Sequence, residues 1–140
     1  MPRISTFMYC ESTQFIGQPN SNNQKLTIEN PLHVFAPPFI PGTFSFGIVF
    51  GLLGIDPSEE HALRLVFSYS KGTDPVIDTG SVNIPKQLEN NVPVETNGFM
   101  MNMDFRNVIF REEGSYETQL FLNGEILGTF PIIVKRGESN

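Results

Sequence analysis

The sequence predicts an all-β protein, and three observations lead to this prediction. The 140 residues include 12 Gly and 11 Pro, which break the chain into short segments. Thirteen of them are Phe, a residue type that is enriched in strands. Within several segments, apolar residues recur at every second position, as they do in strands. We therefore expect a single immunoglobulin-like antiparallel β-sandwich of seven to eight strands, with at most a short helical turn near residues 57–61.

Length, charge, the longest apolar run and the cysteine content limit the number of domains, the partners and the compartment that we expect. A chain of 140 residues suits one domain spanning 1–140. The net charge of −6 argues against binding to the backbone of a nucleic acid. The longest apolar run, 44–55, is shorter than the roughly 20 residues that a membrane helix needs, so we expect no membrane partner. The single cysteine, Cys10, excludes an intrachain disulfide and favours the cytoplasm.

The N-terminal third begins with a strand over residues 3–9, where Ile4, Thr6 and Met8 alternate with their neighbours. The polar stretch 11–24 is rich in Asn, Ser and Gln and is predicted to be a mobile loop. Short strand-like pieces follow it at residues 25–28 and 31–35.

The stretch 36–42 contains three prolines, which each lack a backbone donor, so it is expected to be a crossover rather than a central strand. Two interpretations of its Phe39 and Ile40 stay open: they are buried under the sandwich, or they form a contact surface. Together with Phe35, they are our candidate interface residues.

Residues 43–55 predict the central strand of a sheet, because they carry no charge and have apolar groups on both faces. One face is bulky, and the other includes Gly47 and Gly51. A glycine within a strand marks a bulge or the close approach of another group. These glycines either admit Phe rings from the same sheet or line a shallow groove for a partner or ligand.

Between residues 56 and 98 we expect a turn, two strands and a long loop. Asp56, Pro57 and Glu59 have the spacing of a helix start, with a cap, a first-turn proline and a capping-box carboxylate. Residues 61–70 alternate as a strand, which we prefer to a helix in this β-rich context. A shorter, broken strand is expected at 75–84 and a long loop at 85–98.

Residues 99–111 form another alternating strand, with a bulge expected near Arg106 and Asn107 that restores the register of Val108 and Phe110. Its three methionines are interpreted as core filling in preference to a binding face.

The C-terminal segment carries the clearest signals. Gly114 and Tyr116 have the spacing of a tyrosine corner, in which the hydroxyl bonds to backbone a few residues upstream. Thr118 stands where antibody domains have their second cysteine. Asn123-Gly124 then predicts a tight hairpin turn before a last strand at 125–135.

The segments EEHALRLVFSYSKG and FREEGSYETQLFLNGEILGTFPIIV, within residues 60–135, resemble a group of small uncharacterised bacterial β-sandwich proteins. Those proteins pair a His-x-Leu strand with a Gly-x-Tyr hairpin. The resemblance implies a β-sandwich with an immunoglobulin-like C-terminal hairpin, and it implies no activity.

Residues with catalytic or metal-binding chemistry are few. The chain has two histidines, His33 and His61, and their neighbours do not have the spacing of zinc ligands. Cys10 follows an apolar strand, where a lone cysteine behaves as a small hydrophobic residue. We therefore expect no catalytic residues, no metal site and no cofactor.

The sequence favours a non-enzymatic module that acts through contact with another protein or with a second copy of itself. Two alternatives stay open: a structural subunit of a phage or other particle, and a protein that binds or sequesters a small ligand.

Overall fold

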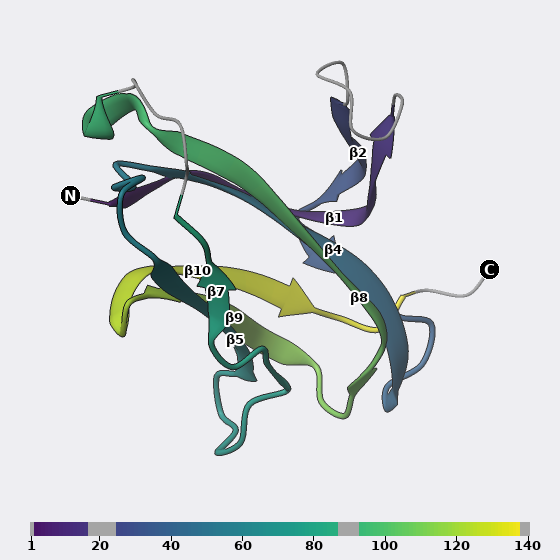
Figure 1. Ribbon diagram of the computed structural model, residues 1–140. Coiled ribbons are helices and arrows are strands. Elements are labelled where there is room, and N and C mark those ends of the chain that lie inside the picture. Colours follow the sequence, from purple (N-terminus) through teal and green to yellow (C-terminus); the bar gives the residue numbers. More distant parts are fainter. Residues whose placement is uncertain (1, 17–24, 87–92, 138–140) are drawn as a thin grey trace.

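Two β-sheets face each other across an aromatic core in the computed structural model of the chain, which describes residues 2–16, 25–86 and 93–137 (Figure 1). The first sheet has the strand order β2-β1-β4-β8, and the second has the order β3-β10-β9-β5-β6, with β7 also paired to β5. All the pairings are antiparallel except that of β3 with β10. The strands are β1 (Arg3–Ile16), β2 (Lys25–Leu32), β3 (Val34–Phe35), β4 (Gly42–Leu53), β5 (His61–Tyr69), β6 (Ile77–Asp78), β7 (Val82–Ile84), β8 (Gly98–Phe110), β9 (Gly114–Leu122) and β10 (Glu125–Val134), and a 3-10 turn, η1 (Val94–Thr96), precedes β8.

The predicted all-β sandwich is confirmed, although the described residues contain ten strands where we expected seven or eight. The difference comes from three strands of two or three residues. The broken strand expected at 75–84 divides into β6 and β7, because Gly80 has a positive φ of 65° and turns the chain between them. Among the described residues, no helix is long and apolar enough to cross a membrane.

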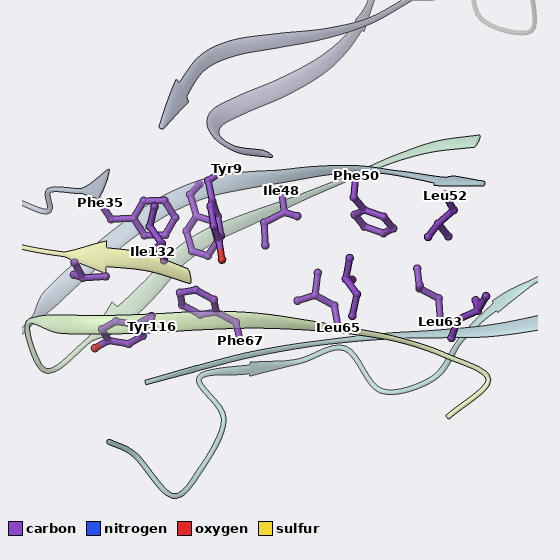
Figure 2. Close-up of a cluster of buried hydrophobic side chains, with 14 of the residues drawn as sticks. Tyr9, Phe35, Ile48, Phe50, Leu52, Leu63, Leu65, Phe67, Tyr116 and Ile132 are labelled. Atoms are coloured by element: carbon purple, nitrogen blue, oxygen red, sulfur yellow. The ribbon is translucent and has the colours of Figure 1, made fainter. Parts of the chain in front are cut away.

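The core lies between β4 of the first sheet and β5 of the second. Figure 2 shows Ile48, Phe50 and Leu52 of β4 above Leu63, Leu65 and Phe67 of β5. β4 is buried on both faces from Phe46 to Leu52, as we expected for a central strand. Burial of these side chains supplies the main driving force for joining the two sheets.

Three segments differ from the predicted loops and turns. The stretch 11–24 is not a loop throughout, because β1 continues to Ile16 and pairs with β2; residues 17–24 lie outside the described part. No helix begins at Asp56, whose Oδ1 accepts from the Ser58 amide at 2.9 Å in a tight turn before β5. Within 85–98, residues 87–92 lie outside the described part and η1 follows them.

The tyrosine corner, the hairpin turn and the bulge predicted for the C-terminal half are present. The Tyr116 hydroxyl donates to the Glu112 carbonyl oxygen at 2.7 Å, which is the bond of a tyrosine corner. Asn123 and Gly124 have φ angles of 52° and 84°, as the predicted hairpin turn requires. The expected bulge in β8 is also found, with Asn107 at φ 54° and a register shift against β4. The immunoglobulin-like character of the whole sandwich stays a prediction.

Candidate interaction surface

The outer face of β4 is not the open groove that Gly47 and Gly51 suggested. Both glycines are buried, and side chains from the flanking strands β1 and β8 cover them. Asp104 and Cys10 lie over Gly47, and Ser5 and Met100 lie over Gly51. The occupants are polar and sulfur-containing groups, so neither alternative, Phe rings or a shallow groove, describes these two positions.

A short chain of hydrogen bonds spans Gly47 and ties β1 to β8 across the intervening β4. Asn102 Nδ2 donates to Thr13 Oγ1 at 2.8 Å, and the Thr13 hydroxyl donates to Asp104 Oδ1 at 3.0 Å. Below them, burial, and secondarily the Asp104 carboxylate, raises the pKa of the Cys10 thiol. The thiol therefore stays protonated and unreactive at neutral pH.

Replacing Gly47 with alanine is expected to lower the free energy of unfolding by about 1–3 kcal/mol. The new methyl group would lie 2.7 Å from Asp104 Oδ1 and 3.0 Å from Cys10 Sγ, so the polar chain over β4 must shift. Urea denaturation monitored by tyrosine fluorescence measures the change. Gly72→Ala is the matched control, because its methyl group would be no closer than 3.4 Å to Tyr69. Equal stability of the two variants would contradict this account of Gly47.

The three candidate interface residues have different environments. Phe35 is fully buried against Phe46 and Tyr9, so it cannot contact a partner, and its prediction as an interface residue is wrong. The reason is that β3 pairs with β10 and directs this ring into the core. Ile40 is half-buried and packs against the core. Phe39 is 72% exposed, in the crossover that leads from one sheet to the other.

The residues with potential catalytic chemistry lie on separate elements. Cys10 is fully buried on β1, and His33 is exposed at the bend between β2 and β3. His61 is buried at the start of β5, where Nε2 lies 2.9 Å from the Asp56 carbonyl oxygen and Nδ1 lies 3.1 Å from Asn123 Nδ2. The described ranges hold no group of three or more His, Cys, Asp or Glu side chains arranged to bind a metal ion.

The most conspicuous unoccupied surface is the free edge of β8. Within the described part of the chain, β8 pairs with β4 on one side and with no strand on the other. Its first six residues, Gly98–Met103, contain neither a charged residue nor proline. Met100 is 50% exposed, and the side chains on the core-facing side are only half-buried. Those side chains are Phe99, Met101, Met103 and Phe105.

The other strand edges that the described residues leave unpaired are interrupted by features that the first six residues of β8 lack. One of them is β1 from Arg3 to Met8, where a bulge lies between Ile4 and Thr6. β2 carries Lys25, Glu29 and Pro31, and Asn30 interrupts it with a φ of 53°. β3, β6 and β7 have only two or three residues each. β3 covers only Ile133 and Val134 of β10, and the remaining edge of β10 contains Glu125 and Pro131. Charges, proline and short length all discourage pairing with another chain. In β8, by contrast, the bulge at Arg106 and Asn107 limits pairing only beyond Phe105.

Two hollows lie along the open side of the sandwich next to β8. The larger one, of about 630 Å³, lies between Tyr69 and Ile77 on one side and Asn107 to Ile109 on the other. The smaller one, of about 210 Å³, is lined by Phe99 together with Ile84 and His61. The free edge of β8 and these hollows form one surface, which we call the open-side surface.

Sequence reasoning did not find this surface. It identified the strand at 99–111 and its bulge, but it assigned the methionines to the core. Whether a strand is central or at an edge depends on which strands lie beside it, and the pairing of β8 with β4 spans more than 40 positions of the chain. One signal was available in the sequence: Gly98–Met103 contain no charged residue and no proline, the residue types that discourage pairing at an edge.

A model of a family of unknown function, DUF6941, matches residues 17–135. The chain belongs to this family. The match begins well before residue 60, so it includes the Pro-rich crossover and β4 as well as the segments that carried the resemblance. No curated protein matches the chain.

The sandwich of this DUF6941 member is similar to part of a solved structure, the alkylpurine DNA glycosylase AlkC of Pseudomonas fluorescens bound to DNA that contains an abasic site analog. The similarity has a TM-score of 0.55 at 11% sequence identity and covers 96% of this chain. The chain spans only 30% of the length of that enzyme. At this identity, the similarity concerns the fold alone.

Proposed function

We propose that the protein is a non-enzymatic interaction module that binds another polypeptide through the open-side surface. The observation that carries the proposal is the free edge of β8, a long strand whose first six residues contain neither a charged residue nor a proline. An exposed strand edge offers a row of backbone donors and acceptors to an extended segment of a partner. Half-buried apolar side chains beside this edge would gain further burial in such a complex.

Two further observations support the non-enzymatic part of the proposal. Cys10, His33 and His61 lie on separate elements, and the two hydrogen bonds of His61 occupy both of its ring nitrogens.

The negative net charge supports a protein partner over a nucleic acid. The single, buried Cys10 supports residence in the cytoplasm.

Native mass spectrometry of the protein, freshly purified from cells that express it naturally, tests this proposal. We expect the chain to carry the additional mass of a polypeptide, either its own or another. Met101→Lys should remove that mass, because an inward-facing lysine on an edge strand opposes strand addition. Ile126→Lys is the matched control: Ile126 is 51% exposed on β10, away from β8, and its replacement should leave the complex intact.

Two results would count against the proposal. One is a monomer that carries a small molecule instead of a polypeptide, which would favour the ligand-binding alternative. The other is a polypeptide complex that Met101→Lys and Ile126→Lys affect equally.

A further inference from the structure

We infer that the occupant of the free edge is a second copy of this chain, whose β8 pairs antiparallel with β8 and joins the two four-stranded sheets into one sheet of eight strands. This inference rests on the proposed function, because it names the partner of the same surface. Three features of β8 support the self-pairing: the length of its free edge, the order of side chains along it and the position of its bulge.

The bulge fixes the length of the pairing segment. Regular backbone runs from Gly98 to Phe105, and the register against β4 shifts beyond it. Two copies of the same strand can pair antiparallel only about a two-fold axis, so some residue near the middle must lie opposite itself. With Asn102 on the axis, residues Phe99 to Phe105 pair without including the bulge, and only Gly98 of the regular segment stays outside the ladder.

This register matches the two faces of the strand. On the core-facing side, Phe99 lies opposite the partner's Phe105, and Met101 lies opposite the partner's Met103. All these side chains are only half-buried in the single chain. Pairing would therefore extend the apolar layer of each sandwich across the junction.

The outer face also fits this register. Asn102 lies opposite its own copy, with its side chain bonded to Thr13 on β1, and Met100 lies opposite the partner's Asp104, so no two like charges meet. A shift of one residue would place core-facing side chains beside outward-facing ones. A shift of two residues would either bring the bulge at Asn107 into the ladder or leave the core-facing Phe105 without a partner in β8.

The described residues leave the free edge of β8 accessible for this arrangement. Among the described residues, no strand lies beyond β8 in its sheet, and the exposed side chains Met100 and Ile109 belong to β8 itself. Of the charged residues of β8, Asp104 lies one residue before the end of the paired segment and Arg106 lies one residue beyond it.

Cysteine cross-linking tests the position of the axis. In an Asn102→Cys variant, the two new thiols would face each other, and mild oxidation should yield a covalent dimer on a non-reducing gel. An Ile126→Cys variant is the control, because Ile126 is exposed on β10 of the other sheet. Cys10 is fully buried, so its thiol does not compete in either variant.

We expect the Asn102→Cys variant to cross-link at least about tenfold faster than the Ile126→Cys variant, because the dimer raises the effective concentration of the thiols at its axis. Equal rates for the two variants would overturn the proposed axis.

Sedimentation equilibrium of the full chain tests the register. Met100→Glu places two like-charge pairs in each dimer, against the partner's Asp104, whereas Met100→Lys places two attractive pairs there. The side chain of Met100 is half-exposed, so both variants should fold, which circular dichroism verifies. We expect the glutamate variant to dissociate about tenfold more readily than the lysine variant. Equal dissociation constants would overturn the register.

The outcomes separate this inference from the proposed function. A wild-type chain that stays monomeric at the highest soluble concentration overturns the self-pairing. If that monomer binds a different polypeptide, and Met101→Lys releases it, the proposed function stands without the self-pairing. If that monomer binds no polypeptide, or binds one equally well after Met101→Lys and Ile126→Lys, both fail.

Discussion

Replacing Phe67 with alanine is expected to lower the free energy of unfolding by about 3–5 kcal/mol, enough to unfold a marginally stable domain. The Phe67 ring is fully buried at the centre of the aromatic core. It contacts rings from both sheets, at centroid distances of 5.3 Å to Phe46 and 5.6 Å to Tyr116. Truncation would leave a cavity that these rigid neighbours can fill only in part.

Phe39→Ala is the control for this experiment, because it removes the same side chain from a position that is 72% exposed. Its effect on the free energy of unfolding should stay within about 0.5 kcal/mol. Chemical denaturation of the three proteins measures both changes. If Phe39→Ala proves as costly as Phe67→Ala, the ring in the Pro-rich crossover is buried and the described packing is wrong there.

The second large effect is expected at Tyr9, which connects the two sheets through polar bonds inside the core. Its hydroxyl lies 2.7 Å from Thr118 Oγ1 on β9 and donates to the Phe130 carbonyl oxygen on β10, also at 2.7 Å. Tyr9→Phe removes these bonds and leaves the Thr118 hydroxyl without a partner in a fully buried position. We expect a loss of about 1–3 kcal/mol.

A double-mutant cycle with Thr118→Val isolates the bond between the two hydroxyl groups. Valine has nearly the shape of threonine, so the double variant should be more stable than the sum of the two single changes predicts. Strict additivity would show that the Tyr9 and Thr118 hydroxyl groups do not interact.

The dependence of stability on pH above 10 provides an independent test of the buried Tyr9 hydroxyl. Burial raises the pKa of Tyr9 above its ordinary value of 10.0, an effect that its hydrogen bond with Thr118 only partly offsets. Above pH 10 the unfolded chain therefore loses this proton while the native chain keeps it, so stability falls as the pH rises. One such group contributes a slope of up to about 1.4 kcal/mol per pH unit. Tyr9→Phe should reduce the slope between pH 10 and 11, and an unchanged slope would contradict the role of Tyr9.

Much of the fold could be predicted because local signals determine it. The uncharged run at 43–55 became the buried central strand β4, and Asn123-Gly124 became the hairpin turn between β9 and β10. The tyrosine corner at Tyr116 also followed from local spacing. Each of these signals lies within about a dozen consecutive residues and depends little on distant partners.

The predictions that failed depended on distant neighbours. β1 continues to Ile16 because β2 pairs with it, and Figure 1 shows this part of the two strands rising away from the sandwich. This part of β1 and β2 has little contact with the core, so its sequence needs no apolar alternation. Its polar composition therefore led to the prediction of a loop. Phe35 was misassigned for a similar reason: its burial depends on β10, about 100 residues later. The filled groove over Gly47 likewise required side chains from β1 and β8.

The parallel pairing of β3 with β10 also bears on how the chain folds as it is synthesised. Phe35 pairs with Val134, and the Tyr9 hydroxyl bonds to the carbonyl of Phe130, so β3 and the Tyr9 hydroxyl meet these partners only after nearly the whole domain has been made. On a ribosome, the exit tunnel delays the last strand further. Contacts this distant in sequence are associated with slow folding. Until β10 emerges, the aromatic core remains accessible to chaperones and to other nascent chains.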